Sequence, residues 1–454
     1  MMSVSDAVLS GAGDRVLAQA ILSDYYEEKQ ISYPINPFQM LTDYGVPFAF
    51  RTFSDKKIEG VYFPAQDAND TPVVGINIKR PITRQRYTAA HELCHHIKDT
   101  KSSYVCTASS NDSIEKYAEN FAAELLMPYN EIKRQISQYE CNGTVSFDSV
   151  LLIAEYFGVS FKSCLNRIGY TFKKIDGEYS NLQARANKYH ADKKREAMGY
   201  THCMLYEQLI NAVEPWISYT PNDFIKAKFC NNYIFNDSRL EGVDLEKTKV
   251  AEIVTDIRLH GRNSHYCTEK YENEIAVAGH ALMYEYMFEI SKDVVVDIFS
   301  LVKLHKQLYS CAPSPDFGGS LRNSDPLVLG AKFETIPYSY VASEFCVLNG
   351  AVKDIIDAIE KDPLSYYIKL VTKLHHCLTV LHPFGDGNGR SSRAFLNLLL
   401  IRRGIFPIYI KVEEKNEYYD ALSEADSGQY DKLYMVIYKA IMRSQTELTE
   451  ASPL

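Results

Sequence analysis

The sequence predicts an α+β protein of two domains, a mixed N-terminal domain followed by a mainly helical C-terminal domain. With 454 residues, 46% of them hydrophobic, the chain is long enough to bury two cores. Two unrelated clusters of chemically active side chains, one beginning at His91 and one at His382, give each domain a site of its own. Apolar residues at helical spacing flank the second cluster, which makes the C-terminal half the helical one.

The first cluster is the segment His91-Glu-Leu-Cys-His95. Two histidines four residues apart share one face of a helix, so both imidazoles can bind one Zn²⁺ while Glu92 deprotonates the attacking water. This pattern is loose by itself, and a third ligand has to come from elsewhere. The run 114–128 predicts a second helix that projects Glu115 from its buried face, which completes a His/His/Glu site.

Together these segments resemble the ImmA/IrrE metallopeptidase family, whose hallmark is (R)(F/Y)TxAHExxH followed by ExxANxFAAxLLMP, over residues 36–170. The resemblance implies a zincin-like fold, Glu92 as general base, and three zinc ligands, His91, His95 and Glu115. Glu119 replaces a common Asn, which leaves open whether Glu115 or Glu119 reaches the metal. Cys94 replaces the usual Gly and is either a packed residue or a thiol that reaches the site.

The boundary between the domains is predicted after Gly169, where a polar, Gly-containing stretch begins. The segment from Ala184 to Arg195 is rich in Lys, Arg and Ala and predicts a solvated helix. We therefore expect a metallopeptidase-like domain at residues 1–170, a helical connector at 171–200 and a second domain at 201–454.

The second cluster is His382-Pro-Phe-Gly-Asp-Gly-Asn-Gly-Arg390-Ser-Ser-Arg393, a loop between helices predicted at 366–381 and 394–401. Pro383 ends the first helix. Gly387 and Gly389 lack side chains, so backbone N–H groups at the start of the second helix can approach phosphate oxygens.

The charged residues of this loop complete a phosphate-handling site. Asp386 is a hard oxygen ligand suited to Mg²⁺, and Arg390 and Arg393 can fork onto the remaining phosphate oxygens. His382, at the rim, can deprotonate an incoming hydroxyl. The residues alone therefore indicate phosphoryl or nucleotidyl transfer from a nucleoside triphosphate.

This loop resembles the signature of Fic (Fido-fold) proteins, HPFx(D/E)GNGRxxR, at every defined position. The resemblance implies transfer of AMP from ATP to a hydroxyl side chain of a target protein, with His382 as general base and Asp386 holding Mg²⁺. In the Doc branch, which phosphorylates its target, a Lys stands at the position of Gly389, so the Gly favours nucleotidyl transfer. The nucleotide-binding residues implied are Phe384, Gly387, Asn388, Gly389, Arg390 and Arg393.

Residues 235–243 resemble the inhibitory helix motif (S/T)xxxE(G/N) of Fic proteins, whose Glu pairs with the second signature Arg and blocks productive γ-phosphate binding. Here Glu241 would face Arg393. The position four before Glu241 is Asp237 rather than Ser or Thr, although Ser238 is adjacent.

Two further segments extend the resemblance. Residues 319–338 contain two short β-like runs around a Gly turn and resemble the β-hairpin flap that holds a target segment by strand addition. Tyr418 resembles a tyrosine that often lies near the adenosine, and it could equally belong to the core.

Composition adds few constraints. A net charge of −9 argues against broad, nonspecific DNA binding, so we expect no direct nucleic-acid partner. The ten cysteines include no CxxC pair, no signal sequence opens the chain, and no apolar run is long enough to span a bilayer. We therefore expect a reduced, cytoplasmic protein without a membrane partner.

The two resemblances imply a bifunctional regulatory or toxin-like protein that uses ATP, Mg²⁺ and Zn²⁺. The Fic-like half would modify a Ser, Thr or Tyr hydroxyl of a target protein and be autoinhibited by Glu241. The N-terminal half would be a zinc-dependent endopeptidase acting on a repressor or antitoxin-like partner. Two alternatives remain open: a non-catalytic zinc-stabilised sensing or docking domain, and a Fic-like half in which Glu241 activates a water to remove AMP.

Overall fold

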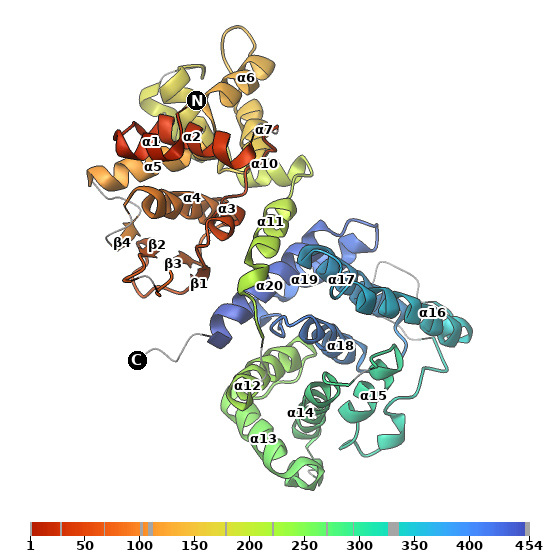
Figure 1. Cartoon of the computed structure of the whole chain (residues 1–454). Coiled ribbons are helices and arrows are strands. Elements are labelled where there is room, and N and C mark those ends of the chain that lie inside the picture. The colour runs from red at the N-terminus through yellow and green to blue at the C-terminus, as the bar shows by residue number, and fades with distance from the viewer. Residues whose placement is uncertain are drawn as a thin grey trace. The chain divides into compact units, whose positions relative to one another are not determined.

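The computed structural model describes residues 2–27, 30–67, 69–99, 103–107, 112–177, 179–219, 222–268, 271–293, 295–325 and 336–449. The chain divides into two compact units, Met1–Trp216 (unit 1) and Ile217–Leu454 (unit 2) (Figure 1). The predicted α+β class is confirmed, because a small sheet accompanies a mostly helical chain. Among the described residues, no helix is both long enough and apolar enough to cross a membrane.

Unit 1 combines helices with one four-stranded sheet. The strands are β1 (Phe48–Arg51), β2 (Ile58–Phe63), β3 (Val73–Asn77) and β4 (Tyr104–Thr107), in the spatial order β1-β3-β2-β4. Strand β1 is parallel to β3, whereas β2 is antiparallel to both β3 and β4. The helices are α1 (Val4–Leu9), α2 (Asp14–Tyr26), α3 (Pro37–Asp43), α4 (Ile82–Lys98), α5 (Ser113–Leu126), α6 (Tyr129–Tyr139), α7 (Phe147–Phe157), α8 (Phe161–Asn166), α9 (Leu182–Lys188), α10 (Ala191–Ala197) and α11 (Cys203–Val213).

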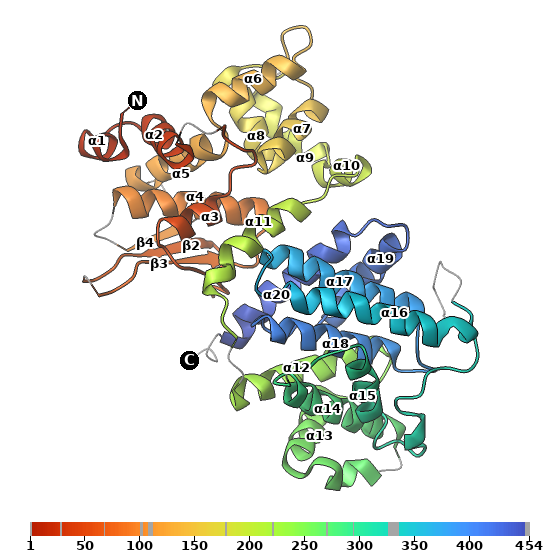
Figure 2. The ribbon, with the colours of Figure 1, turned by 45° about the vertical axis from the view of Figure 1, so that its right-hand side comes forward.

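Helix α4 is the centre of unit 1. It runs along the sheet and packs on β2, while α3 and α5 pack against its other sides (Figure 2). Residues 88–95 of α4 are all buried, so both the predicted metal-binding histidines and the apolar side chains between them are enclosed. The packing of the sheet and the two helices therefore withdraws the HExxH segment from water.

Unit 1 extends beyond the predicted boundary at residue 170. Helix α11 packs on α3, and the buried guanidinium of Arg86 on α4 links α11 to the rest of the unit. Its Nε donates to the carbonyl of Gly158 at 3.0 Å and its Nη1 donates to Oε1 of Gln208 on α11 at 2.6 Å. Trp216 Nε1 also donates to Thr42 Oγ1 at 3.3 Å. Residues up to Trp216 therefore group with unit 1, whereas the division by family at 170 and 200 stays a prediction.

The single solvated helix expected over Ala184–Arg195 is instead two short helices, α9 and α10, so that expectation was wrong. His190 interrupts them with a left-handed backbone at φ 52°. The preceding Tyr189 stacks on Phe161 with ring centroids 4.7 Å apart, and its hydroxyl donates to Asp148 at 2.6 Å. The segment turns at this point because Tyr189 is anchored to unit 1.

Unit 2 is helical. Its helices are α12 (Asp223–Leu240), α13 (Lys247–His260), α14 (Glu272–Ile290), α15 (Phe299–Leu308), α16 (Tyr338–Asp357), α17 (Leu364–Leu381), α18 (Asn388–Arg402), α19 (Lys415–Ala425) and α20 (Asp431–Thr449). Helix α18 is central: residues 391–401 are buried, and α14, α15 and α17 pack around it. The helices predicted at 366–381 and 394–401 are thereby confirmed.

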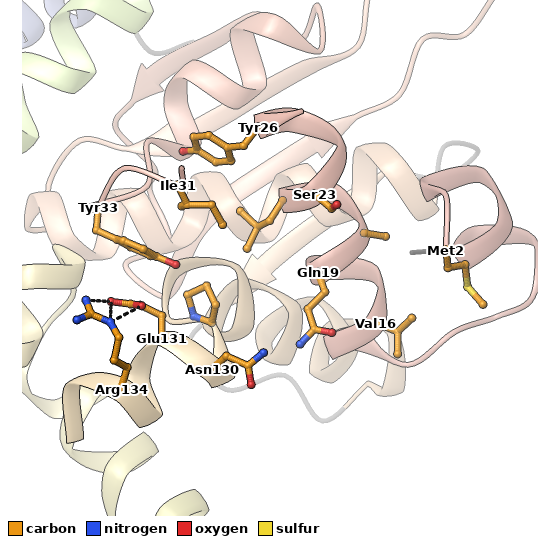
Figure 3. Close-up of a pocket in the computed structure, with 13 residues that line it drawn as sticks. Met2, Val16, Gln19, Ser23, Tyr26, Ile31, Tyr33, Asn130, Glu131 and Arg134 are labelled. Atoms are coloured by element: carbon orange, nitrogen blue, oxygen red, sulfur yellow. Dashed lines mark hydrogen bonds and ion pairs between the residues drawn. The ribbon is translucent and has the colours of Figure 1, made fainter. Parts of the chain in front are cut away.

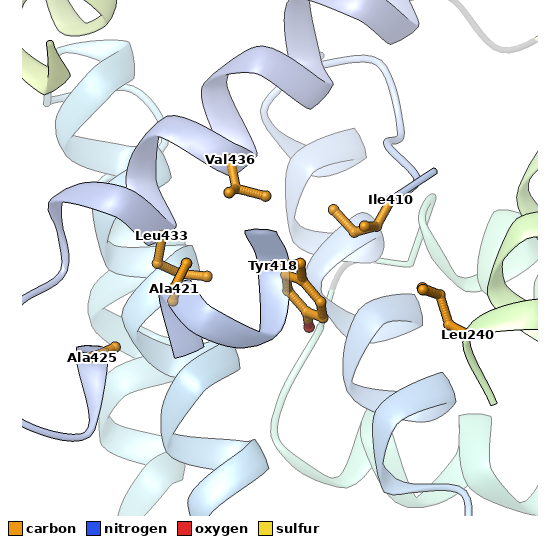
Figure 4. Close-up of a cluster of buried hydrophobic side chains, with 7 residues drawn as sticks. All are labelled: Leu240, Ile410, Tyr418, Ala421, Ala425, Leu433 and Val436. Carbon is orange, nitrogen blue, oxygen red and sulfur yellow. The ribbon is translucent and has the colours of Figure 1, made fainter. Parts of the chain in front are cut away.

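One apolar cluster of unit 2 joins the end of α12 to α19 and α20. Leu240 approaches Ile410 and Tyr418, while Ala421 and Leu433 pack behind them (Figure 4). Leu240 is the last residue of α12 and immediately precedes Glu241. The cluster therefore fixes the position of the helix end that carries the predicted inhibitory residue.

The cysteines differ from the expectation of a chain without disulfides. Cys267 and Cys311 form a disulfide, although 44 residues separate them in the sequence, and the other eight cysteines are free. The packing of α14 against α15 brings the segment around Cys267 to the end of α15. Spacing along the chain cannot reveal such a pair.

Gly279 marks the closest approach of α14 to α15. A Cβ at this position would lie 2.0 Å from the carbonyl oxygen of Leu308, so the backbone of α15 would have to shift. We expect Gly279→Ala to lower the free energy of unfolding of unit 2 by about 1–3 kcal/mol, the usual cost of overpacking. Thermal unfolding followed by circular dichroism measures the effect.

Gly350 provides the matched control, because it lies in α16 and a Cβ added there would meet nothing within 4 Å among the described residues. Gly350→Ala should be neutral or stabilising by about 1 kcal/mol, since Ala favours a helix over Gly. Equal shifts in melting temperature for the two variants would contradict the close approach of α14 and α15.

Candidate functional sites

The three predicted zinc ligands of unit 1 converge from two helices. His91 and His95 lie one turn apart on α4, and Glu115 lies in the first turn of α5. His91 Nε2 is 3.1 Å from His95 Nε2, and the two carboxylate oxygens of Glu115 are 3.2 Å from His91 Nε2 and 3.4 Å from His95 Nε2. All three side chains are buried. One cation could contact all of these atoms at once.

His95 has a second layer of partners that the motif itself does not include. Its Nδ1 lies 3.2 Å from Asp99 Oδ2, and the ring of Tyr104 stacks on its imidazole with centroids 4.2 Å apart. A carboxylate on the far nitrogen fixes the tautomer of a metal-binding histidine and leaves Nε2 to bind the metal. The four-residue spacing between His95 and Asp99 is a signal that could have revealed this pair.

Burial and mutual contacts shift the pKa values of all three ligands. Burial alone would lower the pKa of His95, but its hydrogen bonds with Asp99 and Glu115 raise the pKa to about 9. Burial prevails at His91, whose pKa is lowered. Burial would raise the pKa of Glu115, yet the two histidines hold it at about 2. Metal binding to these ligands therefore has to displace a proton from His95.

Glu92 is fully buried beside these ligands, and burial raises its pKa to about 8. Neither of its carboxylate oxygens has a hydrogen-bond partner within the described part of the chain. A buried carboxylate without a partner is costly, so its retention next to a His/His/Glu set indicates a chemical task. Two histidines and one carboxylate are also the donor set of catalytic zinc sites, so these residues fit zinc.

The geometry of the site distinguishes between the ligands that the sequence left open. Glu115, but not Glu119, belongs to the group of ligand atoms within 4.8 Å of one another. Cys94 is buried on α4 outside that group. A different thiol, Cys106 of β4, lies within 4.8 Å of ligand atoms of His91 and Glu92. Sequence spacing did not identify Cys106, because the sheet and not the helix brings it there.

A cavity of about 680 Å³ in unit 1 lies away from the metal ligands. It is bounded by α2, residues 31–33 and the start of α6, with the ion pair of Glu131 and Arg134 at one edge (Figure 3). The residues His91, His95, Glu92 and Glu115 do not line it. This cavity is therefore not part of the candidate metal site.

In unit 2, the predicted signature loop connects α17 to α18. His382 ends α17 in a left-handed conformation at φ 50°, which turns the chain into the loop. Arg322 stabilises this turn: its Nε donates to the carbonyl of His382 at 2.8 Å, and its backbone N–H donates to the carbonyl of Pro383 at 2.9 Å. Burial lowers the pKa of His382 below its ordinary value. The imidazole is therefore neutral at pH 7, as a general base requires.

Two residues predicted to bind nucleotide have structural contacts in the loop. Phe384 is buried and stacks on His305 of α15 with centroids 3.8 Å apart. The side chain of Asn388 closes the loop, since its Oδ1 accepts from the N–H of Phe384 at 2.9 Å and its Nδ2 donates to the carbonyl of Phe384 at 2.8 Å. These contacts shape the loop, and a direct role in nucleotide binding stays a prediction.

His305 holds the same loop from the α15 side. Its Nδ1 accepts from the N–H of Gly319 at 2.8 Å, and its Nε2 contacts the carbonyl of Asp386 at 2.8 Å. Burial lowers the pKa of His305 to about 4, so the ring is neutral and Nε2 carries the hydrogen that Asp386 accepts. No motif singles out this histidine, because it lies 81 residues from Asp386.

Asp386 and Arg390 border a cavity of about 530 Å³ together with Glu241 and Tyr309. The hydroxyl of Tyr309 donates to Asp386 Oδ2 at 2.5 Å, and Arg390 Nη2 donates to the same oxygen at 3.1 Å. Burial would raise the pKa of Asp386, but these two donors lower it, so the carboxylate is ionised. The side chain of Asp386 is 67% exposed, so its ionised carboxylate is open to a cation such as Mg²⁺.

Arg393 and Glu241 meet at the start of α18. The guanidinium donates from Nη2 to Glu241 Oε1 and from Nε to Asp237 Oδ1. A Cβ on Gly389 would lie 2.6 Å from Glu241 Oε1 and 2.9 Å from Arg393 Nη1. The Glu241 carboxylate therefore stands against the helix N-terminus, where an anion is stabilised by free N–H groups.

The remaining predictions have mixed outcomes. Tyr418 is 1% exposed within the apolar cluster, and its hydroxyl contacts His375 Nε2 at 2.7 Å, which agrees with the core alternative. Its role near an adenosine stays a prediction. The centre of the predicted flap, residues 326–335, lies outside the described residues. Next to it, Leu321 forms an antiparallel bridge with Phe384.

Two family models match this chain. Residues 41–169 match the IrrE N-terminal-like domain, and residues 296–400 match the Fic/DOC family. A protein adenylyltransferase Fic of Culex quinquefasciatus is 25% identical over 238 residues, which are 52% of this chain and 42% of that protein. A protein adenylyltransferase fic-1 of Caenorhabditis elegans is 30% identical over 135 residues, 29% of this chain and 25% of that protein. The chain spans less than half the length of these relatives.

Solved structures give a further comparison. A Fic-1 fragment from Caenorhabditis elegans aligns with a TM-score of 0.43 at 16% identity, over 69% of this chain and 89% of that one. A Fic-domain signaling protein from Bacteroides thetaiotaomicron aligns with a TM-score of 0.41 at 18% identity, over 53% of this chain and 94% of that one.

Proposed function

Because the chain joins an IrrE N-terminal-like domain to a Fic domain, we propose that unit 2 transfers AMP from ATP to a hydroxyl side chain of a target protein. The observation that carries this proposal is the assembly of the signature side chains on one loop: a carboxylate and a guanidinium at the cavity, and a second guanidinium at the N-terminus of α18. The relatives named protein adenylyltransferases support the same reaction.

Each residue then has a defined task. The N–H groups at the start of α18, with Arg390 and Arg393, bind the phosphates, and Asp386 would hold Mg²⁺, which neutralises phosphate charge when bound. His382, neutral at pH 7, takes the proton of the attacking hydroxyl. The oxygen forms a bond to the α-phosphorus, and pyrophosphate leaves with the electrons of the broken bond.

We propose further that Glu241 inhibits this reaction. Its carboxylate pairs with Arg393 and lies against Gly389, so it occupies the position that a γ-phosphate would need. Wild-type protein should then be nearly silent. Glu241→Gly is expected to raise AMP transfer at least tenfold, because releasing one competing contact of about 1.4 kcal/mol is enough for that factor.

The measurement is labelling of whole-cell lysate and of the protein itself with α-labelled ATP. Glu246→Gly is the matched control, because Glu246 is an exposed carboxylate five residues further on, without a capping contact. Equal labelling by wild type and Glu241→Gly would reject autoinhibition. If wild type instead strips AMP from a premodified target faster than Glu241→Gly does, unit 2 removes AMP.

For unit 1 we propose a zinc-dependent endopeptidase acting on a repressor or antitoxin-like partner. A buried general base without a partner among the described residues supports turnover over a purely structural metal, because a docking domain does not require Glu92. His91, His95 and Glu115 would hold the metal, which polarises the peptide carbonyl when bound. With a pKa raised to about 8, Glu92 is protonated at pH 7. A cation bound by the neighbouring ligands would lower that pKa, and the ionised Glu92 would then take the proton of the attacking water and pass it to the leaving amine.

A further inference from the structure

Asp237 is a buried charged residue that the proposed reaction does not use. It is 2% exposed and lies on α12 one turn before Glu241, so both carboxylates project from the same face of the helix. Its Oδ1 accepts from Arg393 Nε, and its Oδ2 lies 3.1 Å from Nε2 of the buried His280. Arg393 therefore has two carboxylate partners.

The two carboxylates bond to different nitrogens of the guanidinium. Asp237 binds Nε (here the Nε edge), whereas Glu241 binds Nη2 at the end of the group beside Gly389 (here the Nη edge). The side chain of Glu241 is 25% exposed, so it can turn into solvent. Asp237, buried where α12 packs on α14, has no such path. Glu241 can therefore leave Arg393 more readily than Asp237 can.

Asp237 stays charged under physiological conditions. Burial would raise its pKa, but the adjacent Arg393 and His280 hold the pKa at about 2. The full negative charge of Asp237 therefore stays beside the Nε edge of the guanidinium even when no anion occupies its Nη edge. A second anion at the Nη edge is repelled by that fixed charge and attracted by the guanidinium at the same time.

We propose that Asp237 sets the affinity of Arg393 for any anion at its Nη edge, weakening its hold on Glu241 and on the γ-phosphate alike. This inference rests on the proposed function, in which the γ-phosphate replaces Glu241. Asp237 is a positioning residue, since it reaches the nucleotide only through Arg393.

The test compares ATP binding in the Glu241→Gly background with and without Asp237→Asn. The amide keeps the shape and an acceptor oxygen but removes the charge, so Arg393 loses its fixed competitor. We expect the dissociation constant for ATP with Mg²⁺, measured by calorimetry on the full chain, to fall about tenfold. The KM for ATP should fall with it, while kcat stays within about twofold.

With Glu241 present, the same substitution should not activate the protein. Asp237→Asn strengthens the hold of Arg393 on Glu241 and on the γ-phosphate alike, so their competition is unchanged and the single variant should remain silent. Activation of that single variant, or an unchanged or weaker ATP affinity in the double variant, would overturn the proposal. Asp223→Asn is the control: it removes the charge of an exposed carboxylate in the first turn of the same helix, so ATP affinity should not change.

A second variant keeps the test decisive if Asp237→Asn fails to fold. In the Glu241→Gly background, His280→Leu leaves the Asp237 carboxylate in place but removes the contact to its Oδ2. Asp237 should then bind Arg393 more strongly and ATP should bind more weakly. Unchanged or tighter ATP binding would refute the proposal. Calorimetry does not require turnover. If Glu241→Gly binds ATP but transfers no AMP, the proposed reaction fails while the order of ATP affinities still tests Asp237. If it binds no ATP, both fail.

Discussion

In the Glu241→Gly background, His382→Ala is expected to lower AMP transfer by a factor on the order of 10²–10⁴, the usual cost of removing a general base. Burial places the pKa of His382 below its ordinary value, so wild-type imidazole is already deprotonated at neutral pH. The pH profile should therefore be flat from pH 7 upward and fall only at acidic pH, where the imidazole gains a proton. Labelling with α-labelled ATP measures both effects.

Two controls separate loss of the base from loss of the fold. His382→Ala should still bind ATP, because the phosphate contacts come from α18 and the two arginines, so calorimetry should give an unchanged affinity. His260→Ala removes an exposed histidine at the end of α13 and should leave transfer unchanged. Labelling that survives in His382→Ala would reject its role as general base.

The local parts of both sites could be predicted because they depend on spacing alone. Histidines at positions i and i+4 share a helix face wherever the helix packs, so the pairing of His91 with His95 follows from the sequence. The same holds for the signature loop, where Pro383 and the glycines impose the turn before α18. Glu115, the predicted third ligand, lies beside the two histidines because α5 packs on α4.

The residues that sequence reasoning missed act across long separations. Tyr309 contacts Asp386 from 77 residues away, and Arg322 contacts the carbonyl of His382 from 60 residues away. Nothing in their local sequence distinguishes them from core or surface residues. These contacts depend on tertiary packing alone, so no periodicity or motif in the sequence could predict them.

Asp237 shows how a departure from a motif becomes informative once packing is known. In the sequence it is a mismatch at a position where Ser or Thr was expected. In the structure it is a buried ion-pair partner of the same arginine that Glu241 binds. The difference lies in burial, because a charge at an exposed position would be screened by water and would influence Arg393 little.

The last prediction separates metal binding from catalysis in unit 1. Wild-type protein should bind one zinc per chain, and His95→Ala should lose it, because one of three ligands is gone and Glu115 and His91 alone form a weak site. Glu92→Gln should retain zinc but lose proteolysis by on the order of 10²–10⁴, since the amide cannot accept a proton. Metal analysis and cleavage of a repressor or antitoxin-like protein encoded nearby measure the two effects.

His96→Ala is the matched control for the zinc measurement. His96 follows His95 on α4, but its Nδ1 contacts the hydroxyl of Tyr62 at 3.3 Å and it takes no part in the ligand group. Its loss should leave the zinc content unchanged. Zinc content that is equally indifferent to a combined His91→Ala and His95→Ala substitution would show that this site holds no metal. Retained zinc with undiminished cleavage in Glu92→Gln would instead show that Glu92 is not the general base.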